Sequence, residues 1–205
     1  MSDPDHHPLF TVFTATYNRA HTLGRVRDSL QSQTFGDFEW LIVDDGSIDD
    51  TRRLVGTWLG SSEFPIRYLY QPHSGKHVAF NTGVREARGA LFLPLDSDDA
   101  AVPQALARFR AHWESIPGET RTRFSAVTAL CMDGHGRPVG GRFPNDITDS
   151  DSLEQYFRYR IRGDNWGFQR TDVIRDFPFP EPPGSRWFRN RSFGSRSRVD
   201  SRPAT

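Results

Sequence analysis

Four short apolar runs, each followed by a segment with helical spacing, constrain the fold of this chain most strongly. They occupy residues 10–14, 38–43, 66–70 and 91–95. The runs are apolar, aromatic or β-branched almost throughout, which is typical of strands that are buried on both faces. Strands of this kind joined by helices predict an α/β fold, with a Rossmann-like, mostly parallel sheet flanked by helices in a single domain.

Local signals place the helices between these runs. Thr22 is suited to cap the N-terminus of the first helix, and Asp49 or Asp50 favours the start of the second through the helix dipole. A further helix is expected from about residue 77 to 88, because apolar residues recur there at helical spacing and Gly89 follows as a stop signal.

Length, charge and cysteine content limit the class of protein. A chain of 205 residues suits one domain, and its 26 basic and 26 acidic residues balance, so no global field would recruit nucleic acid. No run approaches the roughly 20 apolar residues of a membrane span, so we expect no transmembrane segment and at most peripheral contact with a membrane. The polar N-terminus lacks the features of a secretory signal, and the single Cys131 excludes an intrachain disulfide. We therefore expect a cytoplasmic protein.

The second half of the chain is less regular. Residues 124–132 and 166–170 favour strands, and residues 153–159 favour a short helix. The tail, residues 185–205, is rich in arginine and serine without helical or strand periodicity, so we expect it to be disordered. The polar residues 1–8 are expected to be disordered as well.

The sharpest candidate site follows the fourth run directly. We call Asp96, Ser97, Asp98 and Asp99 the 96–99 cluster. Mg²⁺ or Mn²⁺ at a nucleotide site is typically held by one or two carboxylates together with phosphate oxygens. If the segment is extended, Asp96 and Asp98 share one side, so that one can reach a ribose and the other a metal. The alternative is a set of acidic caps for the helix that begins near Pro103.

A second acidic cluster lies at the end of the second run. Residues 44–47 have the sequence Asp-Asp-Gly-Ser, and we call them the 44–47 turn. A carboxylate there can accept hydrogen bonds from a base N–H or a ribose hydroxyl, and the glycine lets the backbone approach closely. A simple turn that caps the next helix is the alternative. Both clusters follow strands, and ligands in open α/β sheets bind beyond the carboxyl ends of the strands.

Two further residues have side chains suited to a nucleotide. Lys76, the only lysine in the chain, precedes a predicted helix and could meet a base or a diphosphate as a point charge. Tyr17 follows the first run and offers an aromatic face on which a base can stack. A solvated lysine and ordinary loop packing are the alternatives. His73 and His77 invite a metal interpretation, but no Cys/His set at zinc spacing accompanies them.

Together these segments resemble the family 2 glycosyltransferases, which have the GT-A fold. The matching segments are Thr-Val-Phe-Thr-Ala-Thr-Tyr-Asn at 11–18, Ser-Gln-Thr at 32–34, Phe-Glu at 38–39, Leu-Ile-Val-Asp-Asp-Gly-Ser at 41–47, Asn-Thr-Gly at 81–83, Ala-Arg-Gly at 87–89 and Leu-Asp-Ser-Asp-Asp at 95–99. The resemblance covers about residues 9–116 and implies a metal-assisted, inverting transferase with a UDP- or dTDP-type sugar donor and a hydroxyl acceptor on a glycan, a lipid or a small molecule. Residues 9–116 would form the nucleotide-sugar-binding half and residues 117–184 the acceptor-side half.

The resemblance also implies roles for individual residues. The nucleobase would be held by Ala15, Thr16, Tyr17 and Asp45, with Lys76 near the base and the diphosphate. The ribose would lie by Asp96 and Ser97, and Mn²⁺ or Mg²⁺ would be bound by Asp98 with Asp99 beside it.

The family's general base has no clear counterpart in this chain. Members usually present an acidic residue, often as Glu-Asp, after the acceptor-side strand, whereas the only carboxylate side chain after Pro183 is Asp200. Asp164 or Glu181 could deprotonate the acceptor instead. The alternative to an active transferase is a nucleotide-sugar-binding remnant without this base. A nucleotidyltransferase is a further rival, but that class favours a glycine-rich basic loop after the first strand, and Tyr17 with its neighbours does not supply one.

Overall fold

The structure is a computed structural model that describes residues 7–161, 165–181 and 197–200. These residues divide into two compact units. The first unit contains residues 7–105 and 170–181, and the second contains residues 106–161, 165–169 and 197–200. Residues 170–181, expected in the acceptor-side half, thus pack with the first unit.

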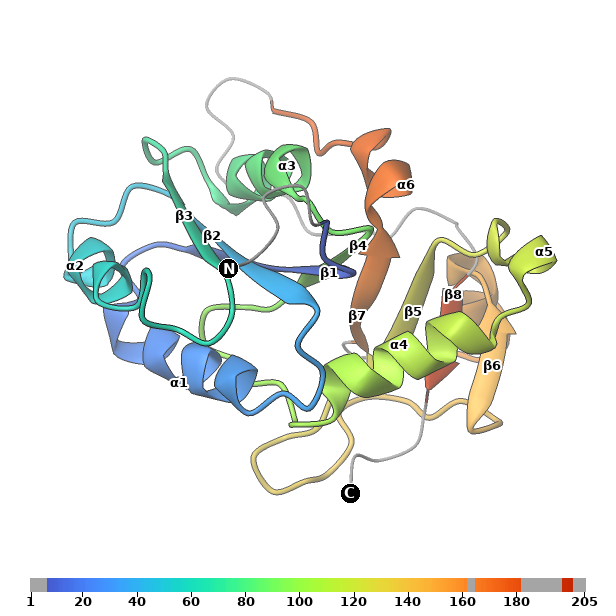
Figure 1. Cartoon of the computed structure of the whole chain (residues 1–205). Helices are drawn as coiled ribbons and strands as arrows, with labels where there is room; N and C mark the ends of the chain where they lie inside the picture. Colours follow the sequence, from blue (N-terminus) through green and yellow to red (C-terminus); the bar gives the residue numbers. More distant parts are fainter. Residues whose placement is uncertain (1–6, 162–164, 182–196, 201–205) are drawn as a thin grey trace. The chain divides into compact units, whose positions relative to one another are not determined.

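A parallel sheet lies at the centre of the first unit (Figure 1). Its strands follow the order β3-β2-β1-β4 and are parallel to their neighbours. The central strand begins with Phe10, which lies opposite Phe38 on one side and Leu91 on the other. The parallel sheet predicted from the apolar runs is confirmed. The strands are β1 (Phe10–Thr16), β2 (Phe38–Asp44), β3 (Ile66–Tyr70) and β4 (Leu91–Pro94).

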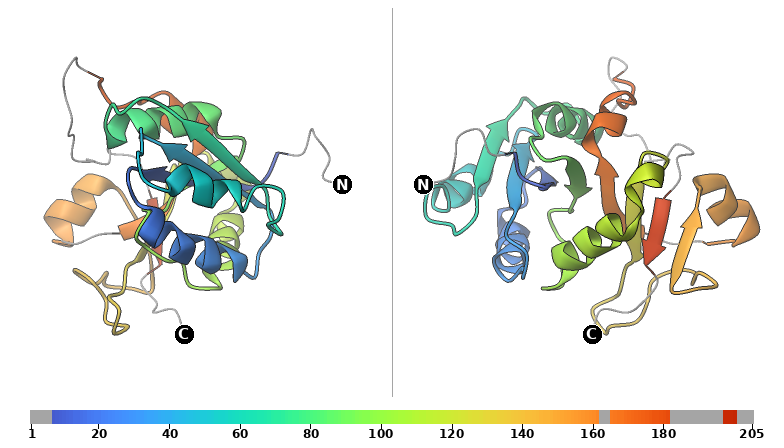
Figure 2. Two further views of the ribbon diagram at one scale, coloured as in Figure 1. Left: turned by 90° about the vertical axis from the view of Figure 1, so that its left-hand side faces the viewer. Right: turned by 45° about the vertical axis from the view of Figure 1, so that its right-hand side comes forward.

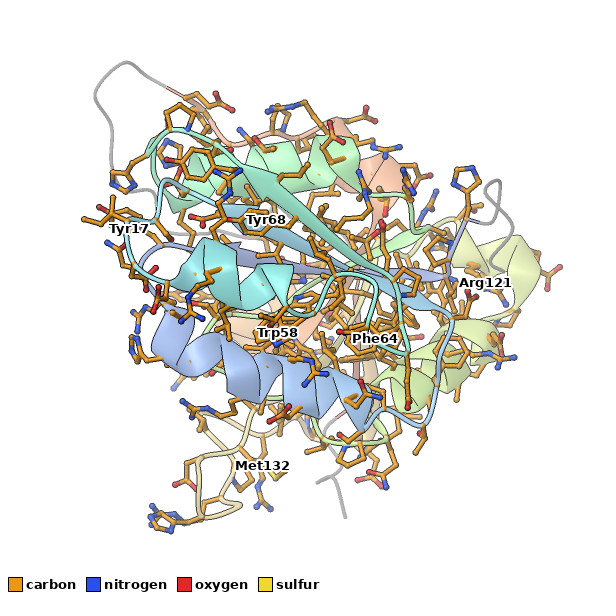
Figure 3. All side chains as sticks on the ribbon, turned by 60° about the vertical axis from the view of Figure 1, so that its left-hand side comes forward. Tyr17, Trp58, Phe64, Tyr68, Arg121 and Met132 are labelled. Carbon is orange, nitrogen blue, oxygen red and sulfur yellow. The ribbon has the colours of Figure 1, made fainter. Side chains whose placement is uncertain are left out.

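Helices cover both faces of this sheet, as Figures 1 and 2 show. On one face α3 and α6 pack against Phe13 and Phe92, whose rings stack 5.1 Å apart. On the other face, with α1 and α2, Trp40 of β2 stacks on Trp58 at 5.8 Å, and Figure 3 shows Trp58 between α2 and α1. Strands β1, β2 and β4 are therefore buried on both sides, which explains why they are mostly apolar without alternation, whereas the edge strand β3 is half-buried. The helices are α1 (Ala20–Gln31), α2 (Thr51–Gly56), α3 (Lys76–Glu86) and α6 (Thr171–Arg175).

The helix boundaries predicted at Thr22 and Gly89 are wrong. Helix α1 begins at Ala20, whose backbone N–H donates to Asp49 Oδ2 at 3.0 Å, so its first turn is capped from another loop. Helix α3 ends at Glu86, before Gly89. The glycine instead allows close approach of two backbones, because a Cβ at this position would lie 2.4 Å from Thr11 N.

The second unit combines parallel and antiparallel strands. Its strands follow the order β7-β5-β8-β6, with β5 and β8 parallel and the other pairs antiparallel. Helix α4 packs on β7 through Phe109 and Trp113, which contact the ring of Phe168 edge to face. The elements are α4 (Ala105–Ser115), α5 (Gly118–Arg121), β5 (Ala126–Leu130), β6 (Ile147–Ser150), the π-helix η1 (Glu154–Arg158), β7 (Asn165–Arg170) and β8 (Ser197–Asp200).

Two segments that were expected to be disordered contain ordered residues. Pro8 is buried, and its carbonyl accepts a hydrogen bond from Ala90 N at 3.4 Å. Within the 185–205 tail, Ser197–Asp200 form β8 between β5 and β6. Residues 1–6 and the rest of the tail lie outside the described residues. No helix in the described ranges is long and apolar enough to cross a membrane.

A buried carboxylate joins the strands of the first unit near the start of β2. Glu39 is 2% exposed, and its Oε1 accepts hydrogen bonds from Thr11 Oγ1 at 2.7 Å and Arg88 N at 2.9 Å. Its Oε2 lies 3.2 Å from Nη1 of Arg67, a largely buried guanidinium on β3. Glu39 therefore connects β2 with β1, with β3 and with the segment that follows α3.

We expect Glu39→Ala to lower the free energy of unfolding by about 2–3 kcal/mol, because it removes the buried acceptor of the Thr11 hydroxyl and of Arg88 N. It also removes one of the two carboxylates that pair with Arg67, which keeps Glu86. Urea unfolding of the full chain measures this loss. Glu114→Ala is the matched control, since the Glu114–Arg110 pair spans 2.8 Å between half-exposed side chains and should contribute well under about 1 kcal/mol. Equal losses in the two variants would contradict the role of Glu39.

Candidate functional site

The predicted site residues of the first unit lie on loops at the carboxyl ends of its strands. Because β1 lies between β2 and β4, the loops that follow these three strands are neighbours. The loop after β3 joins them through hydrogen bonds to Asp45. We call His73, Ser74, Gly75 and Lys76 the 73–76 loop.

Asp45 is a buried carboxylate that holds the 73–76 loop. Only 3% of the residue is exposed. Its Oδ1 accepts hydrogen bonds from Gln71 Nε2 at 2.7 Å and Ser74 N at 3.0 Å, and its Oδ2 accepts one from Gly75 N at 2.8 Å. His73 Nδ1 also lies 2.8 Å from Oδ2. The Asp45 carboxylate thus positions the loop and the start of α3.

The ring of Tyr17 stacks on the imidazole of His73. The ring centroids are 4.1 Å apart and the planes differ by 19°. Figure 3 shows Tyr17 on the loop beyond β1, at the outer edge of the first unit. Tyr17 is 43% exposed, so the aromatic face predicted for a base is accessible in part and covered in part by His73.

Asp44 and Gly46 shape the turn that presents Asp45. Asp44 is fully buried, and it accepts hydrogen bonds from Ser47 N at 2.8 Å and from the Tyr68 hydroxyl at 2.5 Å. Burial and this hydrogen bond to a carboxylate raise the pKa of Tyr68 far above its ordinary value. Gly46 has φ +87°, and a Cβ there would lie 2.7 Å from His73 N. This position therefore requires glycine for both its conformation and its close approach.

The 96–99 cluster forms a turn in which each of two carboxylates pairs with a cation. Lys76 Nζ lies 2.7 and 2.8 Å from the two carboxylate oxygens of Asp96. Arg19 Nη1 lies 3.6 Å from Asp98 Oδ2. The segment is not extended as we assumed, because Asp99 N donates to Asp96 O at 3.1 Å. Asp96 and Asp98 are nevertheless both exposed, whereas Ser97 between them is buried.

The chemistry of this turn suits a divalent cation. Desolvation of the Asp99 carboxylate, together with the negative charges of Asp96 and Asp98, raises the pKa of Asp99. A bound cation would relieve this repulsion. Among the described residues no group of three His, Cys, Asp or Glu side chains is arranged to hold a metal. Asp98 and Asp99 could therefore supply only part of a coordination shell, with phosphate oxygens and water supplying the rest.

The loop after β1 is tied to the 44–47 turn. Asn18 has φ +54°, its N–H donates to Ser47 Oγ at 2.8 Å, and its Oδ1 accepts from Ile48 N at 2.8 Å. Thr16 O accepts a hydrogen bond from Asp45 N at 2.8 Å. The hydroxyl of Thr16 is buried and has no hydrogen-bond partner among the described residues. Ala15 precedes Thr16 at the end of β1 and lies opposite Val43 of β2 in the sheet.

Of the two candidate general bases, the structure describes only Glu181, and its side chain is bound to α3. Glu181 Oε1 accepts a hydrogen bond from Asn81 Nδ2 at 2.6 Å and lies 3.9 Å from Arg85 Nη1, both on α3. No hydrogen bond or ion pair between described residues links Glu181 to the 96–99 cluster. Asp164 lies outside the described residues.

Sequence reasoning missed the parts that Arg19 and His73 play. Arg19 pairs with Asp98. His73, which we weighed only as a metal ligand, contacts Tyr17 and Asp45 instead. The sequence could have indicated that both residues lie at the site, since Arg19 follows Tyr17 closely and His73 precedes Lys76 in the same loop.

We expect Asp45→Asn to lower the free energy of unfolding by about 2–3 kcal/mol, because an amide cannot accept all of the hydrogen bonds that the carboxylate accepts. Urea unfolding measures the change. Asp28→Asn serves as the control, since its side chain is 76% exposed, and it should change stability by no more than about 0.5 kcal/mol. A loss no larger than that of the control would show that Asp45 does not hold the loop.

The fold of the chain is shared with solved glycosyltransferase structures. S. aureus TarS 1–349 superposes with a TM-score of 0.71 at 20% identity, covering 96% of this chain and 58% of that chain. TarS has also been solved with UDP-GlcNAc. Mannosyltransferase PcManGT from Pyrobaculum calidifontis, solved with GDP-Man and Mn²⁺, superposes with a TM-score of 0.61 at 21% identity, covering 89% of this chain and 50% of that chain.

Sequence relatives are transferases that are much longer than this chain. Validoxylamine A glucosyltransferase from Streptomyces hygroscopicus subsp. jinggangensis is 40% identical over 103 residues, which cover 48% of this chain and 24% of that protein. Chondroitin synthase from Escherichia coli is 36% identical over 99 residues, which cover 48% of this chain and 14% of that protein. The matched part of the chain therefore spans less than a third of the length of these relatives.

A family model extends the match beyond single relatives. The model described as glycosyl transferase family 2 matches residues 11–119, which include the loops of the candidate site in the first unit. This match covers more than half of the chain and agrees with the structural neighbours. The chain therefore belongs to glycosyl transferase family 2 and has the GT-A fold.

Proposed function

We propose that this protein transfers a sugar from a UDP- or dTDP-type donor to a hydroxyl acceptor, with metal assistance and inversion at the anomeric carbon. One observation carries the proposal. Adjacent loops of the first unit hold two sets of groups side by side. Tyr17 and Asp45 offer a ring and a carboxylate suited to a base, and the Lys76–Asp96 and Arg19–Asp98 pairs offer charges suited to a metal and a diphosphate. The neighbours solved with UDP-GlcNAc and with GDP-Man and Mn²⁺ support the same class of donor.

The nucleoside would bind at the ends of β1 and β2. Tyr17 offers a ring for stacking, and Asp45 offers an acceptor for an N–H of the base. Ala15 and Thr16, at the end of β1, would contact the base, and Asp96 and Ser97 would lie by the ribose. Tyr17 and Asp45 both contact His73, so they lie close enough together to bind the same base.

The diphosphate would bind where the charges are already paired. Asp98 and Asp99 would hold Mn²⁺ or Mg²⁺, which neutralises the diphosphate and stabilises it as the leaving group. Lys76 and Arg19, which neutralise Asp96 and Asp98 here, would then face phosphate oxygens. These ion pairs lie between half-exposed side chains and are therefore weak enough to exchange partners.

The acceptor would be a hydroxyl on a glycan, a lipid-linked sugar or a small molecule, and a carboxylate would remove its proton. Asp164 and Glu181 are the candidates for this general base. Glu181 is held by the amide of Asn81, so its carboxylate is oriented in this structure. For catalysis it would have to come within hydrogen-bond reach of the acceptor hydroxyl.

A panel of nucleotide sugars tests the proposal as a whole. UDP-, dTDP- and GDP-sugars are added to the full chain with Mn²⁺, with Mg²⁺ or with EDTA, and the melting temperature and donor hydrolysis are measured. We expect a uracil or thymine nucleotide sugar to stabilise the protein, and more so with metal. Absence of stabilisation by every donor under every metal condition would refute the proposal.

The metal assignment predicts the behaviour of Asp98→Ala. The variant should bind UDP with the same affinity in Mn²⁺ as in EDTA, because the cation loses the ligand that places it against the diphosphate. Isothermal titration calorimetry measures both affinities. Asp28→Ala, an exposed acidic residue of α1, should keep the gain that Mn²⁺ gives to the wild-type chain. A gain from Mn²⁺ in Asp98→Ala as large as in the wild type would overturn the assignment.

The general base is tested by two isosteric variants. One of the two variants, Glu181→Gln or Asp164→Asn, should lack the base. That variant should turn over the donor about 10²–10⁴-fold more slowly than the wild type, while its affinity for UDP stays unchanged. The variant that shows this pattern identifies the base. Wild-type turnover in both variants would exclude both residues.

A further inference from the structure

We propose that His73 occupies the position of the nucleobase and must leave it before a nucleotide can bind. This inference rests on the proposed function, because it concerns the base subsite formed by Tyr17 and Asp45. It makes His73 a residue that sets the affinity for nucleotide by competing with the base.

The stacking geometry leaves no space for a base between the two rings. The centroids of Tyr17 and His73 are 4.1 Å apart with nearly parallel planes, which is direct van der Waals contact. A base inserted between them would require the planes to be about 7 Å apart, twice the contact distance. The base can stack on this face of Tyr17 only if the imidazole moves away.

The Asp45 carboxylate is also fully used. A carboxylate has about four lone-pair sites, and the described donors to Asp45 are Gln71 Nε2, Ser74 N, Gly75 N and His73 Nδ1. A base N–H therefore needs one of them to withdraw. Ser74 and Gly75 donate from the backbone, and Gly75 caps α3, so they cannot leave without moving the loop. His73 is a side chain with 41% exposure and can rotate out.

His73 makes the two contacts that a base would make. Its Nδ1 lies within reach of Asp45 Oδ2 at 2.8 Å and of the Asp45 carbonyl at 3.0 Å. Both of these atoms are acceptors, so Nδ1 carries a proton and donates it. A flat ring on Tyr17 with an N–H directed at Asp45 also describes uracil or thymine, whose ring N–H is a donor. The imidazole and such a base therefore compete for the same partners.

With competition of this kind, the apparent association constant equals the intrinsic one multiplied by the fraction of molecules in which the site is open. We expect His73→Ala to bind UMP and UDP about tenfold more tightly than the wild type, measured by isothermal titration calorimetry on the full chain. His73→Phe keeps a ring for Tyr17 but cannot donate to Asp45, and its affinity should lie between the two. His135→Ala removes an exposed histidine of the second unit and should leave the affinity unchanged.

The position of the ring itself can be followed by NMR. The imidazole protons of His73 should carry the upfield ring-current shift of a stacked ring in the free protein and lose it when UMP saturates the site. Unchanged His73 signals at saturation, or an affinity for UMP in His73→Ala that is equal to or weaker than that of the wild type, would overturn the inference. Absence of UMP and UDP binding by the wild type and by His73→Ala alike would refute the proposed function together with it. Wild-type binding that His73→Ala does not improve would refute only the role of His73.

Discussion

The buried carboxylate of Asp45 is the constraint on which the loops of the candidate site depend. It accepts hydrogen bonds from side-chain and backbone donors in the segment after β3, and the backbone N–H of Asp45 donates to the Thr16 carbonyl at the end of β1. A buried charge persists only when hydrogen bonds replace its lost hydration, so the loop cannot move away without exposing or stranding it. Because Gly75 is among these donors, α3 begins at a defined place and its first residue, Lys76, reaches Asp96.

Around this anchor the site contains a second and weaker set of charges. Lys76 with Asp96 and Arg19 with Asp98 are ion pairs between half-exposed side chains. Such pairs contribute little to stability, which allows them to exchange partners with a metal and a diphosphate. Glu39, which is almost completely buried with Arg67, has the opposite role and stabilises the sheet. Burial thus separates Glu39, which holds the fold, from the exposed carboxylates of the 96–99 cluster, which are proposed to bind the metal and the ribose, whereas the buried Asp45 holds a loop and is also proposed to bind the base.

The strands and the positions of the acidic clusters could be predicted from the sequence because they depend on local composition. The apolar runs at β1, β2 and β4 are buried on both faces, and strands buried in this way are built almost entirely from apolar residues. The edge strand β3 is only half-buried. The start of α1 could not be predicted in this way. Asp49, a residue of another loop, caps the first turn, so the local signal at Thr22 was misleading. Strand β8 was missed for a similar reason, because its pairing with β5 and β6 joins segments that are distant in the sequence.

The sequence by itself determined the family, the parallel sheet and the residues that gather at the strand ends. These depend on residue type and order, which the chain carries directly. Only the tertiary structure decided how each carboxylate is used: Asp44 and Asp45 are neighbours of the same kind, yet one supports the turn and Tyr68 while the other holds the 73–76 loop. It also decided that His73 lies on Tyr17 and Asp45. These contacts between loops join residues that are 24 to 56 positions apart in the sequence, and folding alone brings such residues together.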